Sequence, residues 1–313
     1  MSGISVIAKR TFADMATFRR TFLYIAVVLL VPFLFAGAAE ENHLVDTESL
    51  PLGTQGTLLV GYLSVLMFIW VAGVPLIMLT ISSCAGFISG EENGGTLLLL
   101  VSKPIERHEI VLGRYIGFVT YMMLVQTGAL IAVPYMWFLT MELEYDVLRL
   151  LLGMVPMLLV YSLFVILVWG AVSIALSAIT KRTAFIIMGL GFFAMVTFLG
   201  FIQVRAFTMA SGLYEDYSLH YVDAGYHFGN MFVSLVEGGA GIRIPPDIQM
   251  FLGTFTGAYD VTKPFMDPDQ GLMFSSLPRN DLVSPARSFA TSGVLALSLL
   301  GLGVLLFRYK EVH

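Results

Sequence analysis

Long apolar stretches free of Asp, Glu, Lys and Arg dominate the pattern of this chain. Six of them occur, at residues 21–39, 51–90, 115–141, 150–180, 183–204 and 288–307. A helix that crosses a membrane needs about 20 consecutive apolar residues, so each stretch is long enough for one span. The stretches are continuous rather than alternating, which favours helices over a closed β-barrel. We therefore predict an all-α integral membrane protein with six transmembrane helices.

The N-terminal residues 1–20 have a different pattern. Their apolar side chains recur at roughly helical spacing with charged residues between them. This pattern predicts an N-terminal amphipathic helix at the cytoplasmic interface of the membrane. Residues 21–204 then hold spans one to five, and residues 287–313 hold the sixth span and a cytoplasmic C-terminus.

Residues 205–286 contain no apolar run long enough to span, and we place them outside the cell as a large extracellular segment between spans five and six. Connections of this length are usually functional or carry structure of their own. Within it, the aromatic-rich stretch 214–236 is predicted to be one helix, which the following glycines end. Residues 242–286 are predicted to be packed irregular chain.

Composition supports a membrane protein and excludes other classes. Apolar residues make up 57% of the chain and charged residues 12%, and the mean hydropathy is +0.84. A soluble domain carries about twice that charged fraction, and a disordered chain is far less apolar. The net charge of −5, without a basic run, excludes nucleic acid as a partner.

The distribution of Lys and Arg sets the orientation, because basic residues concentrate on the cytoplasmic side. Both termini are placed in the cytoplasm of a multi-pass cell-membrane protein, so that the inner segments hold most of the 17 basic residues: Lys9, Arg10, Arg19, Arg20, Lys103, Arg107, Arg114, Lys181, Arg182, Arg308 and Lys310. The alternative for residues 21–39 is a cleaved signal peptide. Five further spans favour a retained anchor.

The chain offers no evident energy source of its own. A phosphate-binding loop needs Gly-Lys followed by Ser or Thr, and none of the five lysines follows a glycine. Ion-coupled carriers usually keep ionisable groups inside the membrane, and the six stretches have none. A passive pore, or a pump driven by another chain, remains. An intramembrane enzyme would need polar groups such as His or Asp within a span, and is disfavoured.

The segment 86–114, between the second and third stretches, carries the most information. Glu91 and Glu92 end the span, and the turn Asn93-Gly94-Gly95 precedes Thr96, a suitable cap for a short helix at 97–101. A five-residue apolar helix at a membrane surface has little to bury against. It therefore packs either in a groove of a partner protein or on the N-terminal helix of this chain.

This segment resembles the cytoplasmic loop of permease subunits of type 2 ATP-binding-cassette (ABC) exporters. The matching positions are Glu91, Gly95, Thr96, Leu97, Leu99, Leu100, Ser102, Pro104, Ile105, Arg107, Glu109, Leu112, Gly113 and Arg114. Two positions depart, because Asn93 and Leu98 stand where the family usually has Glu. The resemblance extends to the six spans, the N-terminal helix and the C-terminus, but residues 205–286 are longer than the usual outer loop.

The resemblance implies a role and partners for this loop. In the family the short helix couples the permease to a separate ATPase, a role implied here for Glu91, Glu92, Gly95, Thr96, Leu97, Leu99 and Leu100. It also implies two copies of an ABC ATP-binding subunit, which carry ATP and Mg²⁺, and a second permease copy or a homologue. No cofactor, catalytic residue or metal is then expected on this chain itself.

Two histidines with an aspartate, and a single cysteine, are the residues outside the loop that could carry other chemistry. His220, Asp223 and His227 would share one face of a helix at 214–236, and two imidazoles with a carboxylate suit a metal. The surrounding aromatic residues favour packing at the membrane interface instead, so the metal site is the lesser alternative. Cys84 is the only cysteine, cannot form an internal disulfide, and is interpreted as a packing residue.

The favoured function is the permease subunit of an ABC transporter that exports an amphipathic or lipid-like molecule. The uncharged faces of the spans suit such a substrate, in contact with membrane lipid. The alternative is a membrane anchor or assembly factor whose segment 205–286 binds an extracellular partner without transport. Changes at Gly95 or Leu99 should abolish the first function and leave the second intact.

Overall fold

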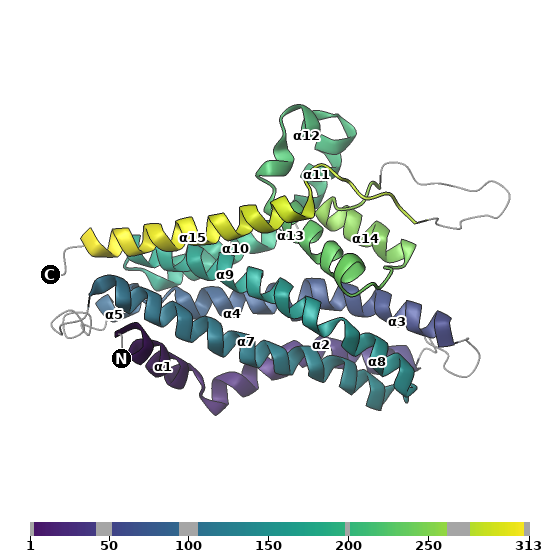
Figure 1. Cartoon of the computed structure of the whole chain (residues 1–313), viewed down its shortest axis with the longest axis horizontal. Helices are drawn as coiled ribbons and strands as arrows, with labels where there is room; N and C mark the ends of the chain where they lie inside the picture. Colours follow the sequence, from purple (N-terminus) through teal and green to yellow (C-terminus); the bar gives the residue numbers. More distant parts are fainter. Residues whose placement is uncertain (1–2, 42–51, 94–105, 198–200, 262–275, 310–313) are drawn as a thin grey trace.

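The computed structural model describes residues 3–41, 52–93, 106–197, 201–261 and 276–309. In these ranges the regular secondary structure is helical, apart from an isolated antiparallel bridge between Tyr259 and Arg279. Long helices lie side by side and form a bundle (Figure 1). The predicted all-α fold is therefore confirmed for the described residues.

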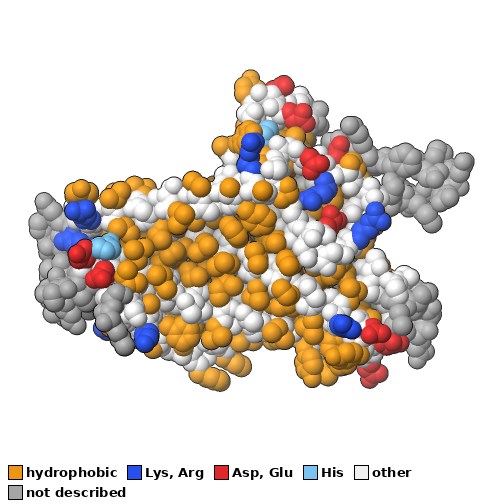
Figure 2. All heavy atoms as spheres, viewed as in Figure 1, with side chains coloured by type: hydrophobic (Ala, Val, Ile, Leu, Met, Phe, Trp, Pro, Cys, Tyr) orange, Lys and Arg blue, Asp and Glu red, His pale blue; other side chains and the backbone are white. Residues whose placement is uncertain are grey.

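Five helical stretches among the described residues are long and apolar enough to cross a membrane. They are Phe18–Glu41, Gly53–Cys84, Arg107–Thr140, Tyr145–Ile179 and Pro285–Tyr309. The first, third and fifth are the single helices α2 (Phe18–Glu41), α7 (Arg107–Thr140) and α15 (Pro285–Tyr309). Figure 2 shows apolar side chains covering the middle of the bundle and charged side chains at its two ends.

The predicted fifth span is the exception. It begins with α10 (Thr183–Met195), whose 13 residues reach about 20 Å and fall short of a hydrocarbon core of about 30 Å. Helix α11 (Phe201–Ala210) follows, and residues 198–200 lie outside the described residues. Five spans are therefore supported, and the sixth stays a prediction.

Two of the spans are interrupted. The second consists of α3 (Leu52–Leu66), the π-helical turn η1 (Met67–Val71) and α4 (Val74–Cys84), with a break at Gly73. A side chain at Gly73 would collide with the carbonyl oxygens of Phe68 and Ile69, so the chain can bend this closely only at glycine. The fourth span consists of α8 (Tyr145–Gly153) and α9 (Val155–Ile179).

Helices α7 and α9 form the centre of the bundle. Helix α7 packs against α1 (Gly3–Met15), α2, α9 and α15, and α9 packs against α4, α10 and α15. Helices α2 and α15 bury only a minor share of their surface and expose rows of large apolar side chains. Such faces suit contact with lipid or with another membrane chain.

The described N-terminal helix is shorter than the helix predicted at 1–20. Helix α1 ends at Met15, and residues 18–20 already form the first turn of α2. Helix α1 lies against α7 at two glycines (Figure 1). A Cβ atom at Gly113 would lie 2.8 Å from Ile7 Cβ, and one at Gly117 would collide with the backbone oxygen of Ala8. These glycines allow the close approach of the two helices.

The predicted single helix at 214–236 is wrong. The structure divides it into α12 (Leu213–Asp216), the 3₁₀ turn η3 (Leu219–Tyr221), α13 (Ala224–Val233) and the π-helical turn η4 (Ser234–Gly239). Ser218 has a left-handed backbone with φ of 51°, which interrupts the helix. Asp223 then begins α13 as its N-cap, because its carboxylate accepts the N–H of Tyr226.

The prediction of irregular chain at 242–286 is also wrong in part, because it contains α14 (Pro246–Thr256). Pro246 occupies the first position of this helix, where its missing N–H costs nothing. Gly257 ends it in the left-handed conformation with φ of 74°. Helix α14 packs against α3, α11 and α13, so the segment is a folded unit at one end of the bundle (Figure 1).

Candidate functional site

The predicted coupling loop begins at α5 (Ser89–Asn93), which contains Glu91 and Glu92. The structure places the Glu92 carboxylate 2.9 Å from the ammonium nitrogen of Lys181, which lies in the connection between α9 and α10. Lys181 is largely exposed, so this ion pair contributes at most about 1 kcal/mol. The remaining predicted coupling residues lie outside the described residues: Gly95, Thr96, Leu97, Leu99 and Leu100.

Buried hydroxyl groups attach the start of the loop to α9 and α10. The Ser177 Oγ atom accepts the backbone N–H groups of Ile88 and Ser89 at 2.9 and 3.1 Å. The Ser89 hydroxyl donates to the Ala85 carbonyl at 2.7 Å, so the Thr183 hydroxyl is the donor in its 2.7 Å contact with Ser89. The two bonds to Ser177 satisfy the N–H group of Ser89, the first residue of the short helix, and that of Ile88 just before it. The end of α4, the start of α10 and the end of α9 therefore form one connected unit.

Two arginines of the resemblance motif hold the return of the loop. Arg107 donates to the carbonyl oxygens of Phe307 and Arg308, at 3.0 and 3.1 Å, and lies over the Phe307 ring. Cations at a helix C-terminus are favourable, because they complement the partial negative charge of its last carbonyls. Arg114 donates to the Phe87 carbonyl at 2.6 Å. The start of α7 is thus joined to the end of α15 and to the chain that precedes α5.

A polar cluster, defined by Tyr24, Gln126 and Ser162, lies buried inside the bundle. The Tyr24 hydroxyl donates to Gln126 Oε1 at 2.6 Å, and Gln126 Nε2 donates to the Val71 carbonyl and to Ser162 Oγ, at 3.1 and 3.2 Å. The cluster joins α2, η1, α7 and α9. The sequence analysis missed this cluster because Gln126 is an uncharged amide inside an apolar run.

The lesser metal candidates do not form a ligand set. Among the described residues, no group of three His, Cys, Asp or Glu side chains is placed to hold a metal ion. The Asp223 carboxylate is engaged by Arg205, whose Nε and Nη2 atoms lie 2.7 and 2.8 Å from its two oxygens. The Tyr214 hydroxyl donates to the same carboxylate at 2.9 Å. Its oxygens are therefore occupied by donors.

The two histidines differ in their hydrogen bonding. His227 Nε2 lies 3.2 Å from the Tyr221 carbonyl, which only accepts, so Nε2 carries the proton and Nδ1 accepts from Ser288 at 3.1 Å. The His220 ring is buried against Tyr221, and its Nδ1 atom has no hydrogen-bonding partner among the residues that the structure describes. Burial and the neighbouring His227 lower the pKa of His220 from its usual 6.5, and Glu215 opposes this shift.

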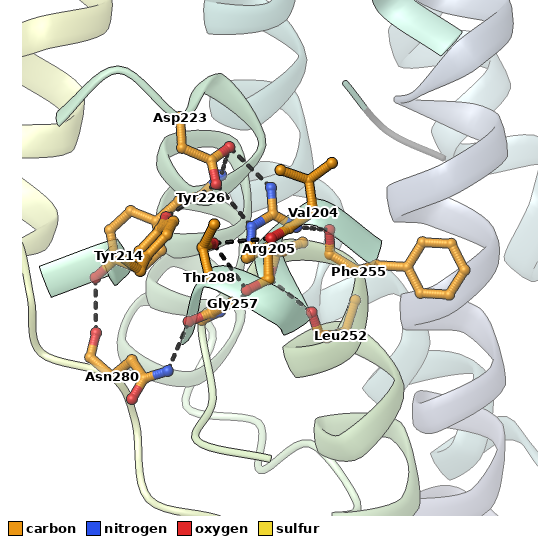
Figure 3. Close-up of polar contacts among 12 residues, drawn as sticks. Val204, Arg205, Thr208, Tyr214, Asp223, Tyr226, Leu252, Phe255, Gly257 and Asn280 are labelled. Atoms are coloured by element: carbon orange, nitrogen blue, oxygen red, sulfur yellow. Dashed lines mark hydrogen bonds and ion pairs between the residues drawn. The ribbon is translucent and has the colours of Figure 1, made fainter. Parts of the chain in front are cut away.

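Arg205 and Asp223 form the buried centre of the segment 205–286 (Figure 3). Their side chains are 1% and 2% exposed. The third arginine nitrogen, Nη1, donates to the Phe255 carbonyl at the end of α14. One side chain of α11 therefore joins α13 and α14. The sequence analysis did not single out Arg205, although it directly follows the fifth apolar stretch.

The free thiol of Cys84 is fully buried at the end of α4. A Cβ atom at Gly170 of α9 would lie 3.6 Å from its sulfur, so the small cysteine fits the contact between α4 and α9. The structure thus places Cys84 at a packing position.

A comparison with family models gives a match over nearly the whole chain. The matching description is "ABC-2 family transporter protein", and the match covers residues 6–312. A comparison with curated proteins gave no match. The match includes the residues between α5 and α7. The chain therefore belongs to the family of ABC-2 transporter proteins and is a membrane permease of that kind.

Proposed function

We propose that this chain is the permease subunit of an ATP-driven exporter with an amphipathic substrate. It spans the membrane six times, with both termini in the cytoplasm and residues 205–286 outside. Two copies, or one copy and a homologue, frame the path. Each copy binds one ATPase chain through the loop between α5 and α7. ATP and Mg²⁺ bind to those ATPase chains, because none of the lysines here follows a glycine as an ATP-binding loop requires.

The anchoring of the loop at both ends supports this proposal most strongly. At its start, the carboxylate of Glu92 and the backbone of Ser89 are tied to the connection between α9 and α10. At its return, Arg107 is tied to the end of α15. A loop that served only to connect two spans would not need hydrogen bonds to three other helices. A loop that transmits force needs such attachments, since packed helices move as rigid bodies.

The attachments indicate how movement would reach the spans. An ATPase that pulls on residues 94–105 would act on α9 through Ser177, on α10 through Thr183, and on α7 and α15 through Arg107. These two groups of helices, one at each end of the loop, meet where α9 packs against α7 and α15. ATP binding would favour one arrangement of the two groups and hydrolysis the other, as a shift between two populated states.

The test is the copurification of the ATPase. The tagged full-length chain is isolated in detergent from its native host, as wild type and as Leu99→Asp/Leu100→Asp. We expect an ATPase with a phosphate-binding loop to copurify with the wild type and to be lost in the variant, because two carboxylates cannot enter an apolar cleft.

The matched control is Val222→Asp, which places a carboxylate at an exposed position in the outer segment. This variant should retain the ATPase. If neither the wild type nor the control brings down an ATPase, the exporter proposal is wrong. If the loop variant retains it, the coupling site lies elsewhere.

The folded outer segment favours one second candidate, a membrane anchor or assembly factor without transport. A buried ion pair and a helix of its own make residues 205–286 a stable platform for a partner. Exposed aromatic and apolar side chains at Tyr217 and Val222 are available on it. Under this function, Tyr217→Asp/Val222→Asp would abolish activity in cells while Leu99→Asp/Leu100→Asp would not.

A further inference from the structure

A groove of about 1350 Å³ lies between α1, α2, α4 and α7. It exceeds the usual 300–1,000 Å³ of small-molecule pockets, so an occupant longer than a typical metabolite fits. The charged side chains that line it come from α1, the start of α2 and the start of α7. Most of the other lining side chains are apolar and come from α1, α2 and α4, although α4 also contributes Ser82 and Ser83. The groove is thus amphipathic along its length.

The charged part of the groove is net positive. Arg10, Arg20 and Arg114 line it, together with one acid, Asp14. Arg10 and Asp14 lie 3.8 Å apart and are both highly exposed, so they offset each other only weakly. Arg114 is held in place by the Phe87 carbonyl. Arg20 has no hydrogen bond or ion pair with any residue that the structure describes, so its charge is available to an anion.

Two helices contribute much of the apolar lining. Leu23 and Val27 come from α2, and Met78 and Leu79 come from α4. Helix α4 has 11 residues and is about 16 Å long, which matches much of an extended aliphatic chain. Leu23 and Val27 keep about half of their surface exposed in spite of their size. An aliphatic chain would cover them.

We propose that this groove binds one anionic amphiphile, with its phosphate-bearing head group at Arg20 and Arg114 and its aliphatic chain between α2 and α4. The groove then serves as the loading site of the transporter. This assignment deepens the proposed function, on which the cytoplasmic position of the arginines rests. Charge complementarity selects the head group, and the length of the apolar walls selects a membrane lipid over free phosphate.

The binding test uses the full-length chain in neutral detergent. Phosphatidylglycerol and phosphatidylcholine with identical acyl chains are titrated separately, and bound lipid is counted by native mass spectrometry. We expect phosphatidylglycerol to bind at least fivefold more tightly. Arg20→Gln should weaken phosphatidylglycerol about fivefold, the usual contribution of one basic residue to anionic lipid binding, and leave phosphatidylcholine unchanged. Inorganic phosphate at millimolar concentration should not displace the lipid.

Matched variants on α2 separate a site from general lipid contact. Arg19→Gln removes a neighbouring charge that does not line the groove and should leave the preference intact. Leu23→Trp fills the groove and should weaken both lipids. Leu30→Trp should not, although Leu30 and Leu23 are both 53% exposed on the same helix. Equal effects of the two arginine variants, or equal affinity for the two lipids, would overturn the proposal.

Two further outcomes are informative. A dimer that Leu23→Trp dissociates, without selective lipid binding, would assign the groove to a second copy of this chain and overturn the proposal. Copurification of the ATPase tests the proposed function separately, because Arg20→Gln should retain it. If the ATPase is absent but phosphatidylglycerol is selected, the binding site stands and the transport function fails. If the ATPase copurifies but the selection is absent, the substrate class is wrong.

Discussion

The side-chain amide of Gln126 donates a hydrogen bond to the backbone carbonyl of Val71, across 3.1 Å in the middle of the bundle. In a regular helix this carbonyl would accept the N–H of the residue four positions later. That residue is Pro75, which has no N–H. Gln126 therefore supplies the donor that the interrupted second span lacks, and it orients this donor through Tyr24 and Ser162.

Replacing Gln126 with Leu should destabilise the bundle by roughly 1–3 kcal/mol. Three hydrogen bonds are lost, each worth about 0.6 and at most about 1.7 kcal/mol inside a membrane. Unfolding in mixed micelles with increasing dodecyl sulfate measures the loss. Thr127→Val is the control, because the Thr127 hydroxyl donates to the Met123 carbonyl of its own helix. Equal losses in the two variants would contradict a special role for Gln126.

Gly117→Val should detach α1 from α7. The added side chain meets the backbone oxygen of Ala8, which cannot move aside as a flexible side chain would. The readout is the thiol labelling rate of Met15→Cys, since Met15 is buried and the native Cys84 is fully buried. We expect a severalfold increase.

Gly128→Val is the control for this experiment. Gly128 lies on the same helix, and a side chain there meets open space. It should leave the labelling of Met15→Cys unchanged. An unchanged rate in Gly117→Val would show that α1 does not depend on this contact.

Arg205→Met should destabilise the outer segment by about 3–5 kcal/mol, because it leaves the buried Asp223 carboxylate without its cation. The expected result is rapid hydrogen exchange in α13 and α14, with unchanged exchange in α7. Arg287→Met is the control, because the side chain of Arg287 is exposed and hydrogen-bonds to the Tyr221 hydroxyl instead of to the buried Asp223. The double variant Arg205→Met/Asp223→Leu should recover part of the stability. If it is as unstable as the single variant, loss of packing rather than an unpaired charge is responsible.

Acid should loosen the same segment through His220. Its pKa in the folded chain lies below the usual 6.5, so the unfolded chain binds more protons between these two values. The contribution of neutral His220 to the free energy of unfolding is therefore fully present above pH 6.5 and is lost as the pH falls below that value. Hydrogen exchange of α13 measured from pH 7.5 to 5.5, compared at equal intrinsic rates, should show this fall. In His220→Phe the fall should be smaller, and an identical pH profile would exclude this residue as the source.

The sequence predicted most of the membrane architecture, because an uncharged apolar run has few alternatives to a spanning helix. It did not predict how the runs are interrupted. Pro75 and Gly73 are visible in the sequence, but the side chain that satisfies Val71 lies on another span. That pairing depends on the packing of α4 against α7 and α9, which periodicity does not contain.

The outer segment was predicted less well for a different reason. The aromatic content of residues 214–236 suggested one helix. Two local features divide it: the left-handed backbone of Ser218 and the carboxylate of Asp223, which caps α13. The start of α14 at Pro246 and its end at Gly257 follow standard capping chemistry and were available from the sequence. The ion pair of Arg205 with Asp223 was not, since it depends on tertiary packing.

The break at Gly73 has a consequence for the range of states that the permease can adopt. A continuous helix acts as a lever, so one end opens when the other closes. Here α3 packs with α8 and α14 at one end of the bundle, whereas α4 packs with α9 and α10 at the other. Because the helix is interrupted between the two halves, each half can move with its own neighbours. Such a span permits a state in which both ends are shut and the cargo is enclosed between them.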